Sequence, residues 1–170
     1  MNRKNIYLPC GAVLLSVFLV GSVSANEDCV PITGKIFNNA LGPGSTLGTA
    51  HIKLDKEKFK CGIQGVGKNF NPDDPNDIGP LNFDHTIVCD DDVGDADPVH
   101  SQLLWDTSGY PTAELEDCGY GLTSFSFYEE SRPVNGTGKF AGVTGGQITV
   151  EGTLFCSLAI DMEFSGELCF

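Results

Sequence analysis

The sequence predicts an all-β protein that folds as one eight-stranded, antiparallel, closed barrel. Apolar and polar residues alternate with a period of two along most of the chain, which is typical of strands with one buried face. No segment after the first 25 residues shows the sustained periodicity of an amphipathic helix. The alternating segments number about eight, and eight strands can close a barrel whose interior is filled by side chains or holds one small ligand.

The expected strands follow one another along the chain, separated by polar or glycine-rich turns. The last one has the clearest pattern, because Ile160, Met162 and Phe164 share one face while acidic residues alternate with them. The polar run at 55–58 predicts a hairpin turn between two adjacent strands. The eight expected strands cover residues 30–37, 49–55, 59–64, 81–90, 101–107, 121–130, 147–156 and 160–168.

The composition is that of a globular domain with a strongly acidic surface. Of 170 residues, 41% are apolar and 19% are charged, and 23 acidic residues against 10 basic ones give a formal net charge of −13. Such a surface repels phosphate backbones and anionic lipids, so nucleic acid is not expected as a partner. Beyond the N-terminal segment, no apolar stretch reaches the ~20 residues of a membrane-spanning helix.

Residues 1–25 have the three parts of a secretory signal peptide: a basic start, an apolar core at 11–20 and a small-residue cleavage pattern that ends at Ala25. We therefore expect cleavage after Ala25, which leaves residues 26–170 as a single barrel domain. That chain would be secreted or periplasmic and would make no membrane contact after cleavage. Because two of the 10 basic residues leave with the leader, 8 basic residues remain against 23 acidic ones, a net charge of −15.

Six of the seven cysteines lie in the expected mature chain. An exported protein meets oxidising conditions, and an even number of cysteines there predicts structural disulfides. A zinc site is the alternative, but no two of these cysteines stand at a C-x-x-C or similar ligand spacing. In a closed barrel of even strand number the first strand pairs with the last, so we expect a bridge between Cys29 and Cys169. The expected remaining bridges join Cys61 to Cys89 and Cys118 to Cys156.

A glycine-rich run at 135–152, NGTGKFAGVTGGQITVEG, surrounds a single aromatic residue, Phe140. Glycines at this density allow positive φ and close approach of chains, as at a turn or bulge that leads into a strongly bent strand. An ordinary glycine-rich turn is the simpler interpretation. The run is a poor phosphate-binding loop, because it lacks the order G-x-x-x-x-G-K-[ST].

The same run resembles the signature G-T-G-[KR]-F-x-G-A-x-G of the allene oxide cyclase-like and dirigent-like barrels. Gly136–Phe140, Gly142 and Gly145 match it, and Val143 stands where these families usually have Ala. The resemblance implies an eight-stranded antiparallel barrel of the calycin-like type, often trimeric in plants, whose lumen binds apolar or phenolic small molecules. It transfers no catalytic residue, because the opening segment VPITGKIFNN does not show the cyclase motif and its asparagines at 38–39 stand at an expected strand end.

Two titratable residues are the candidates for a catalytic or polar binding role inside the barrel. His85 alternates in phase with Leu81 and Ile87, so its side chain is expected to face the interior. Glu129 and Glu130 follow an aromatic segment, and because neighbouring strand residues face opposite ways, only one of them can border the lumen; Glu129 is the candidate. A structural role as a hydrogen-bonded core histidine is the alternative for His85.

Two acidic loops offer oxygen ligands for calcium. Asp90, Asp92, Asp95 and Asp97 cluster beside glycine in one of them, and a second loop at 73–77 is similarly acidic. Neither follows the D-x-[DN]-x-[DN]-G-x₅-E pattern, and solvated turns that keep an exported protein soluble are the favoured alternative. No other cofactor is expected, because the three histidines are scattered without metal-ligand spacing.

The sequence therefore favours an exported, disulfide-stapled barrel that binds a small apolar ligand or serves as an interaction module, without catalysis of its own. A cyclase, isomerase or dirigent-like protein that acts by confinement in the lumen is the alternative from another class. A calcium-stabilised surface protein is a third, and a homo-oligomer is compatible with each. The ligand contacts are expected from Phe125, Phe127, Phe140 and Phe164.

Overall fold

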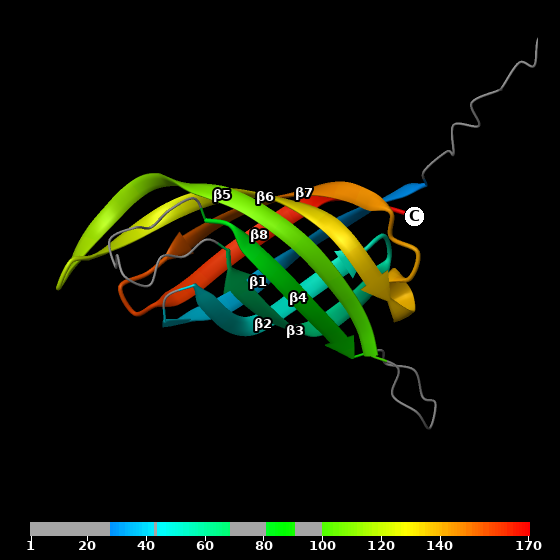
Figure 1. The fold of residues 1–170 in the computed structure, drawn as a ribbon, viewed down its shortest axis with the longest axis horizontal. Coiled ribbons are helices and arrows are strands. Elements are labelled where there is room, and N and C mark those ends of the chain that lie inside the picture. The colour runs from blue at the N-terminus through cyan, green and yellow to red at the C-terminus, as the bar shows by residue number, and fades with distance from the viewer. Residues whose placement is uncertain (1–27, 43, 69–80, 91–99) are drawn as a thin grey trace, which may run out of the picture.

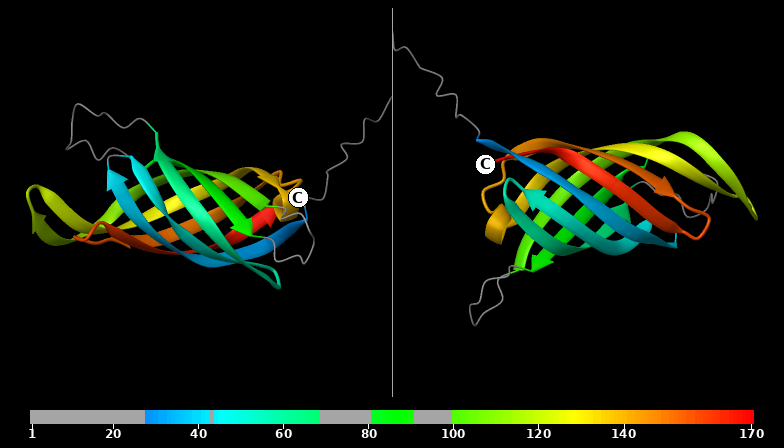
Figure 2. Two further views of the ribbon diagram at one scale, coloured as in Figure 1. Left: turned by 90° about the horizontal axis from the view of Figure 1, so that it is seen from below. Right: turned by 180° about the vertical axis from the view of Figure 1, so that it is seen from behind.

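The computed structural model describes residues 28–42, 44–68, 81–90 and 100–170. These residues form one closed antiparallel barrel in which each strand pairs with the next and the last pairs with the first (Figures 1 and 2). The prediction of an all-β, eight-stranded barrel is confirmed for this part of the chain. The strands are β1 (Cys29–Gly42), β2 (Ser45–Leu54), β3 (Glu57–Gly67), β4 (Phe83–Asp90), β5 (His100–Gly119), β6 (Leu122–Thr137), β7 (Gly145–Leu154) and β8 (Ala159–Cys169), with a short 3₁₀ helix, η1 (Gly138–Phe140), between β6 and β7.

The expected leader, residues 1–25, lies outside the described residues. Within the described part of the chain, no helix has the length and apolar character that a membrane crossing would require.

Alternation with a period of two decides which side chains fill the barrel. In β8, Met162 and Phe164 are buried, whereas Asp161 and Glu163 are exposed, as the sequence pattern predicts. The same alternation in the other strands builds one core of aliphatic and aromatic side chains. Its largest fully buried members include Trp105, Phe140, Ile32, Ile36, Ile52, Ile63, Ile87, Leu103, Ile148 and Leu168.

An inward-facing glycine gives one large core side chain its room. Gly34 of β1 and Phe164 of β8 are register partners. A Cβ at Gly34 would lie 2.5 Å from the Phe164 ring and 2.2 Å from the backbone oxygen of His51. Because that volume is left free by glycine, the Phe164 ring extends into the interior and meets Trp105 edge-on, with the ring centroids 5.5 Å apart.

The glycine-rich run forms the expected turn, but later in the sequence than its first glycines suggest. β6 continues to Thr137, and η1 then begins at Gly138, whose φ of 60° favours glycine. This turn carries Phe140 into the core, where it is fully buried and its ring centroid lies 5.5 Å from that of Phe59. The single aromatic residue of the run is therefore a structural core residue.

The three predicted disulfides are present: Cys29–Cys169, Cys61–Cys89 and Cys118–Cys156. The first joins register partners of β1 and β8, and the second joins register partners of β3 and β4. Cys29–Cys169 thus links the first strand to the last, as barrel closure predicts. Three disulfides are typical of proteins that fold in an oxidising environment.

The β5–β6 hairpin is much longer than the sequence pattern predicts. The expected strand at 101–107 continues to Gly119, and the tip of the hairpin extends beyond the other strands (Figure 1). We call residues 111–123 the arm. All of them are exposed except Cys118, so they lack the alternation of buried and exposed positions that indicates a strand. The Cys118–Cys156 disulfide ties the arm to the turn between β7 and β8.

β1 also runs further than expected, to Gly42, so the strand end expected at 38–39 is wrong. The ladder to β2 continues through the Ala40–Thr46 pair. Asn38 is only 2% exposed and its Nδ2 donates a hydrogen bond to Thr46 Oγ1 at 3.2 Å. That bond lets an amide occupy a position that the alternating pattern reserves for an apolar side chain.

Candidate functional site

Besides Ser101 and Ser124, six buried polar side chains lie on the inner wall of the barrel, on strands from β1 to β6. We call them the polar strip; they are Asn38, Thr46, His85, Thr107, Glu129 and Ser131. All of them stand within an apolar core, where burying a polar group is unfavourable unless it finds a partner. Their contacts therefore show which of these groups have a hydrogen-bond partner among the described residues and which do not.

The first part of the polar strip converges on Gly65 of β3. Gly65 is the register partner of Thr46 on one side and of His85 on the other. Thr46 Oγ1 and His85 Nε2 lie 2.5 Å and 3.0 Å from the position that a Gly65 Cβ would occupy. Because glycine leaves this position empty, a hydroxyl from β2 and an imidazole nitrogen from β4 approach each other inside the barrel.

The second part of the polar strip is a hydrogen-bonded chain from β4 to β6. His85 Nδ1 lies 3.0 Å from Thr107 Oγ1, and Thr107 Oγ1 lies 2.7 Å from Ser131 Oγ. Thr107 and Ser131 are direct register partners of β5 and β6. The chain holds the imidazole through Nδ1. His85 Nε2 makes no hydrogen bond to another described residue, so it is the ring nitrogen that a further group can reach.

Glu129 lies two residues before Ser131 on β6, so both side chains face the interior. Its register partner is Gly109 of β5, and Glu129 Cγ lies 2.5 Å from where a Gly109 Cβ would be, so glycine makes room for the acidic side chain. Glu129 is 4% exposed and Glu130 is exposed, which confirms that only one of the pair faces inward. No described residue forms a hydrogen bond or ion pair with the Glu129 carboxyl.

Burial moves the pKa values of the two titratable residues of the polar strip in opposite directions. Burial raises the pKa of the Glu129 carboxyl to about 8. Burial lowers the pKa of His85 to about 4, an effect that the Asp84 carboxylate partly offsets. At neutral pH the polar strip therefore carries a protonated acid and a neutral imidazole, with no formal charge.

Three further buried polar atoms have no hydrogen-bond partner among the described residues: Trp105 Nε1, Asn38 Oδ1 and, just before β4, Asn82 Oδ1. Trp105 is 1% exposed, and its ring centroid lies 6.1 Å from that of His85. Trp105 Nε1, Asn38 Oδ1 and the Glu129 carboxyl thus give the interior a donor, an acceptor and a protonated acid without a partner in the part of the chain that the structure describes. Protein interiors leave few such groups unpaired, so these mark places for a ligand group or an ordered water.

The four phenylalanines that the sequence predicts as ligand contacts belong to the core. Phe127, Phe140 and Phe164 are buried, and Phe125 is partly buried against them. The rings of Phe125 and Phe127 meet in a T-shaped contact with their centroids 6.2 Å apart. Their packing supplies apolar surroundings for the polar strip and occupies part of the barrel interior.

Of the four aspartates predicted to bind calcium, one belongs to the described residues. Asp90 ends β4 and is exposed, and its Oδ1 lies 3.7 Å from His100 Nδ1. Asp92, Asp95 and Asp97 lie outside the described residues, so the calcium site stays a prediction.

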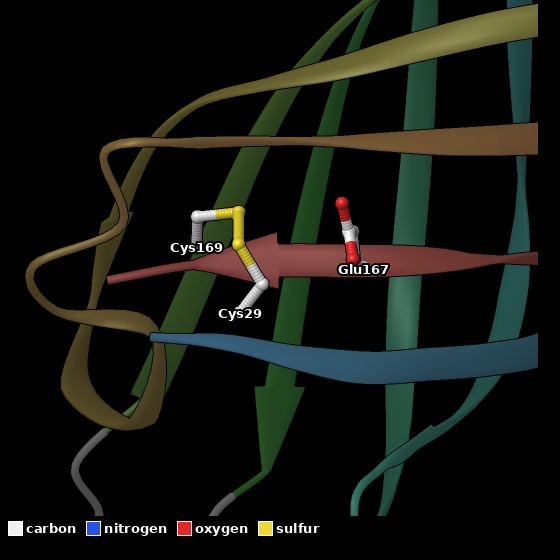
Figure 3. A group of neighbouring side chains, drawn as sticks. All are labelled: Cys29, Glu167 and Cys169. Carbon is white, nitrogen blue, oxygen red and sulfur yellow. A yellow bond between two sulfur atoms is a disulfide. The ribbon is translucent and has the colours of Figure 1, made fainter. Parts of the chain in front are cut away.

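One group of side chains with metal-binding atoms gathers closely within the described part of the chain, and it consists of Cys29, Glu167 and Cys169 (Figure 3). The two sulfur atoms are bonded to each other. Cysteine binds a metal as the thiolate, which a disulfide does not offer. The group is therefore the disulfide between β1 and β8 with a carboxylate beside it.

Sequence reasoning found the two titratable residues of the polar strip and missed their neighbours. Thr107 lies in phase with the apolar residues Leu103 and Trp105, and this phase was the available signal that its hydroxyl faces inward. Gly65 and Gly109 carried no such signal, because the sequence does not show which side chains cross over them.

No family model, no curated protein and no solved structure matches this chain. The geometry of the barrel interior is therefore the basis on which a function can be proposed.

Proposed function

We propose that the protein is an exported binding module whose barrel interior takes up a small, uncharged and largely apolar molecule with an oxygen-containing group. The observation that carries this proposal is a set of polar groups in the apolar core that have no hydrogen-bond partner among the described residues: the buried atoms Trp105 Nε1 and Asn38 Oδ1, and the carboxyl of Glu129. A ligand hydroxyl or carbonyl beside them would satisfy groups that the protein leaves open. The resemblance of residues 136–145 to the allene oxide cyclase-like and dirigent-like signature supports the same class of ligand.

The chemistry of the interior favours a ligand without charge. Because its pKa is raised to about 8, the Glu129 carboxyl is protonated at neutral pH and can donate a hydrogen bond to a carbonyl or hydroxyl oxygen. A carboxylate ligand would be buried without a compensating cation, since the buried residues of the described chain include no lysine or arginine. The apolar part of the ligand would contact side chains such as Phe164 and Met162.

Trp105 provides a direct test, because it is the only tryptophan of the chain and its indole contacts His85 of the polar strip. We expect decanol and decanal to change its fluorescence emission and to raise the melting temperature. Decane at the same thermodynamic activity should do so much less, because it cannot satisfy the unpaired groups. If none of the three probes changes the emission, the interior takes no such ligand, and ordered water satisfies these groups instead.

A pair of neighbouring substitutions tests the role of the acid. Glu129→Met keeps the length of the side chain and removes its hydrogen-bond donor, so we expect decanol to bind about five- to tenfold more weakly. Glu130→Met, on the outer face of the same strand, is the matched control and should keep the affinity of the wild type. Equal weakening in both variants, with both shown to be folded by circular dichroism, would contradict the proposed site.

An isomerase or cyclase is the second candidate, favoured by the opposite pKa shifts of Glu129 and His85. A protonated carboxyl and a neutral imidazole on one wall can serve as general acid and general base at the same pH. Acetophenone tests this chemistry, because loss of a hydrogen next to its carbonyl is visible by NMR as exchange in deuterated water. An acid–base enzyme should accelerate that exchange, and Glu129→Met and His85→Phe should each abolish the acceleration. Exchange at the rate of the buffer alone would argue against catalysis.

A further inference from the structure

A groove lies on the outer face of the barrel, over strands β5 to β8. Its volume is about 600 Å³, which is within the ~300–1,000 Å³ of small-molecule sites in proteins. Its lining includes two tyrosines, Tyr110 and Tyr128, and three carboxylates, Glu151, Asp161 and Glu163. These five side chains occupy outward-facing positions, and no residue of the polar strip lines the groove.

The strand register aligns most of these side chains in one row. Tyr110 pairs with Tyr128, and Tyr128 pairs with Glu151. Glu151 in turn pairs with Glu163, which pairs with Lys35 of β1. The two tyrosine rings are tilted against each other with their centroids 5.8 Å apart. The row therefore begins with two aromatic rings, continues with two carboxylates and ends with one cation.

The charges along this row are incompletely balanced. Glu151 and Glu163 are register partners, and like charges at such positions destabilise a sheet. Lys35 forms an ion pair with Glu163, whereas Glu151 forms none with any described residue. The pKa of Tyr128 is raised, first by desolvation and then by neighbours that include Glu151, which is consistent with negative potential beside its ring. A cation at Glu151 would balance the carboxylate pair.

We propose that this groove binds an organic ammonium ion, a quaternary or alkylated amine with apolar substituents. The faces of tyrosine rings attract such a cation electrostatically, and the carboxylate of Glu151 on the adjacent strand supplies the opposite charge. The apolar substituents of an alkylated amine gain from packing on Tyr110 and Tyr128, whereas a small hydrated cation would not. The proposal is independent of the ligand inside the barrel.

Calorimetric titration with choline tests this proposal, with its uncharged tert-butyl analogue as the reference ligand. Both molecules have nearly the same shape, so a difference in affinity reports the charge. We expect one choline per chain and at least about tenfold weaker binding of the analogue. Absence of choline binding, or equal affinity for the two molecules, would overturn the proposal.

Matched substitutions separate the groove from general attraction to an acidic protein. Glu151→Gln and Tyr128→Leu should each weaken choline binding at least about fivefold. Glu57→Gln on β3 and Tyr120→Leu at the tip of the arm remove the same charge and the same ring outside the groove, and should leave the affinity unchanged. Equal weakening by Glu57→Gln and Glu151→Gln would show attraction to net charge alone and refute the site. If Tyr128→Leu fails to fold, Tyr110→Leu takes its place.

Discussion

Single glycines control where polar groups fit inside this barrel. Gly109 leaves the volume that Glu129 fills, and Gly65 leaves the position where Thr46 and His85 approach each other. Neither glycine has a positive φ, so their role is spatial rather than conformational. A larger residue at either position would displace a member of the polar strip without removing any apolar core side chain.

Glu129 makes the stability of the fold depend on pH. Its pKa rises from an ordinary 4.5 to about 8, so between these pH values the folded chain keeps a proton that the unfolded chain loses. The free energy of unfolding therefore falls as pH rises through this interval. The total decrease is about 1.4 kcal/mol for each unit by which the pKa in the folded chain exceeds the pKa in the unfolded chain. Glu129→Gln keeps the shape and removes the titration. We expect its melting temperature relative to wild type to increase steadily with pH across this interval.

His85 limits the pH interval in which the melting temperature reports the titration of Glu129 alone. Its pKa falls from 6.5 to about 4, so between these values the unfolded chain takes up a proton that the folded chain does not, and stability falls as pH falls. Above about pH 6.5, Glu129 is the only one of these two residues that makes the free energy of unfolding depend on pH. Circular dichroism melts between about pH 6.5 and about pH 8 thus isolate Glu129. A melting-temperature difference that stays constant there would show that the carboxyl is already ionised in the folded protein.

Replacement of glycine by alanine should change the free energy of unfolding differently at Gly34 of β1 and at Gly62 of β3. Gly34→Ala would bring Cβ to 2.2 Å from the backbone oxygen of His51, inside the β1–β2 ladder. We expect a loss of more than ~2 kcal/mol in the free energy of unfolding, measured by chemical denaturation. Gly62 has no atom within 4 Å of its Cβ position, so Gly62→Ala should be neutral or stabilise the fold by up to ~1 kcal/mol. Similar effects at both positions would contradict close packing around Gly34.

At the residue scale, the sequence reveals the phase of a side chain but not its partners. The period-two phase places His85 and Glu129 on the inner face, because it depends only on local strand geometry. The bond between Thr107 and Ser131 joins residues 24 positions apart and depends on the β5–β6 register. Bulges shift that register, and the alternating pattern does not show how many there are. For the same reason the unpaired Trp105 Nε1 had no signal in the sequence.

The arm has little packing of its own, so its disulfide should control its order. Nearly all of residues 111–123 are exposed, and a two-stranded hairpin without a packed face is marginally stable. Replacing Cys118 and Cys156 by serine should make the arm the first site of chymotrypsin cleavage, at Tyr120, while the barrel remains folded. Mass spectrometry of a limited digest measures this.

The matched control for the arm replaces Cys61 and Cys89 by serine. That variant loses one disulfide as well, the one with the shortest span, but keeps Cys118–Cys156, so cleavage at Tyr120 should remain as slow as in the wild type. Equal rates of cleavage in the two double variants would show that the arm is ordered by its strand pairing and not by its disulfide.

Strands with one buried face could be predicted from the sequence, whereas the strands of the arm could not. β8 alternates without interruption from Ile160 to Leu168, because each second side chain there faces the core. β5 loses this alternation beyond Tyr110, because both faces of the arm are exposed. Register shifts between Pro111 and Ala113 and again between Glu114 and Glu116 interrupt the period further.

At the scale of the whole molecule, one strand pair differs from the rest. Each pair from β1–β2 to β7–β8 joins neighbours in the sequence, whereas β1–β8 joins the two ends of the described chain. The number of expected strands predicted this contact, and closure in turn predicted that Cys29 lies beside Cys169. The fold class and the closure were therefore accessible from the sequence, while the contacts among the side chains inside the barrel depended on packing that no local pattern encodes.

The Cys29–Cys169 disulfide should accordingly contribute more to stability than either of the others. It spans 140 residues, against 28 for Cys61–Cys89 and 38 for Cys118–Cys156. In the chain-entropy model these spans correspond to about 5 kcal/mol against about 4 kcal/mol or less. We expect Cys29→Ser with Cys169→Ser to lower the free energy of unfolding most among the three double variants, and to speed hydrogen exchange first in β1 and β8, whose pairing it anchors. Exchange that accelerates equally in all eight strands would mean that β1 and β8 separate only when the whole barrel unfolds, and that their contact has no local stability of its own.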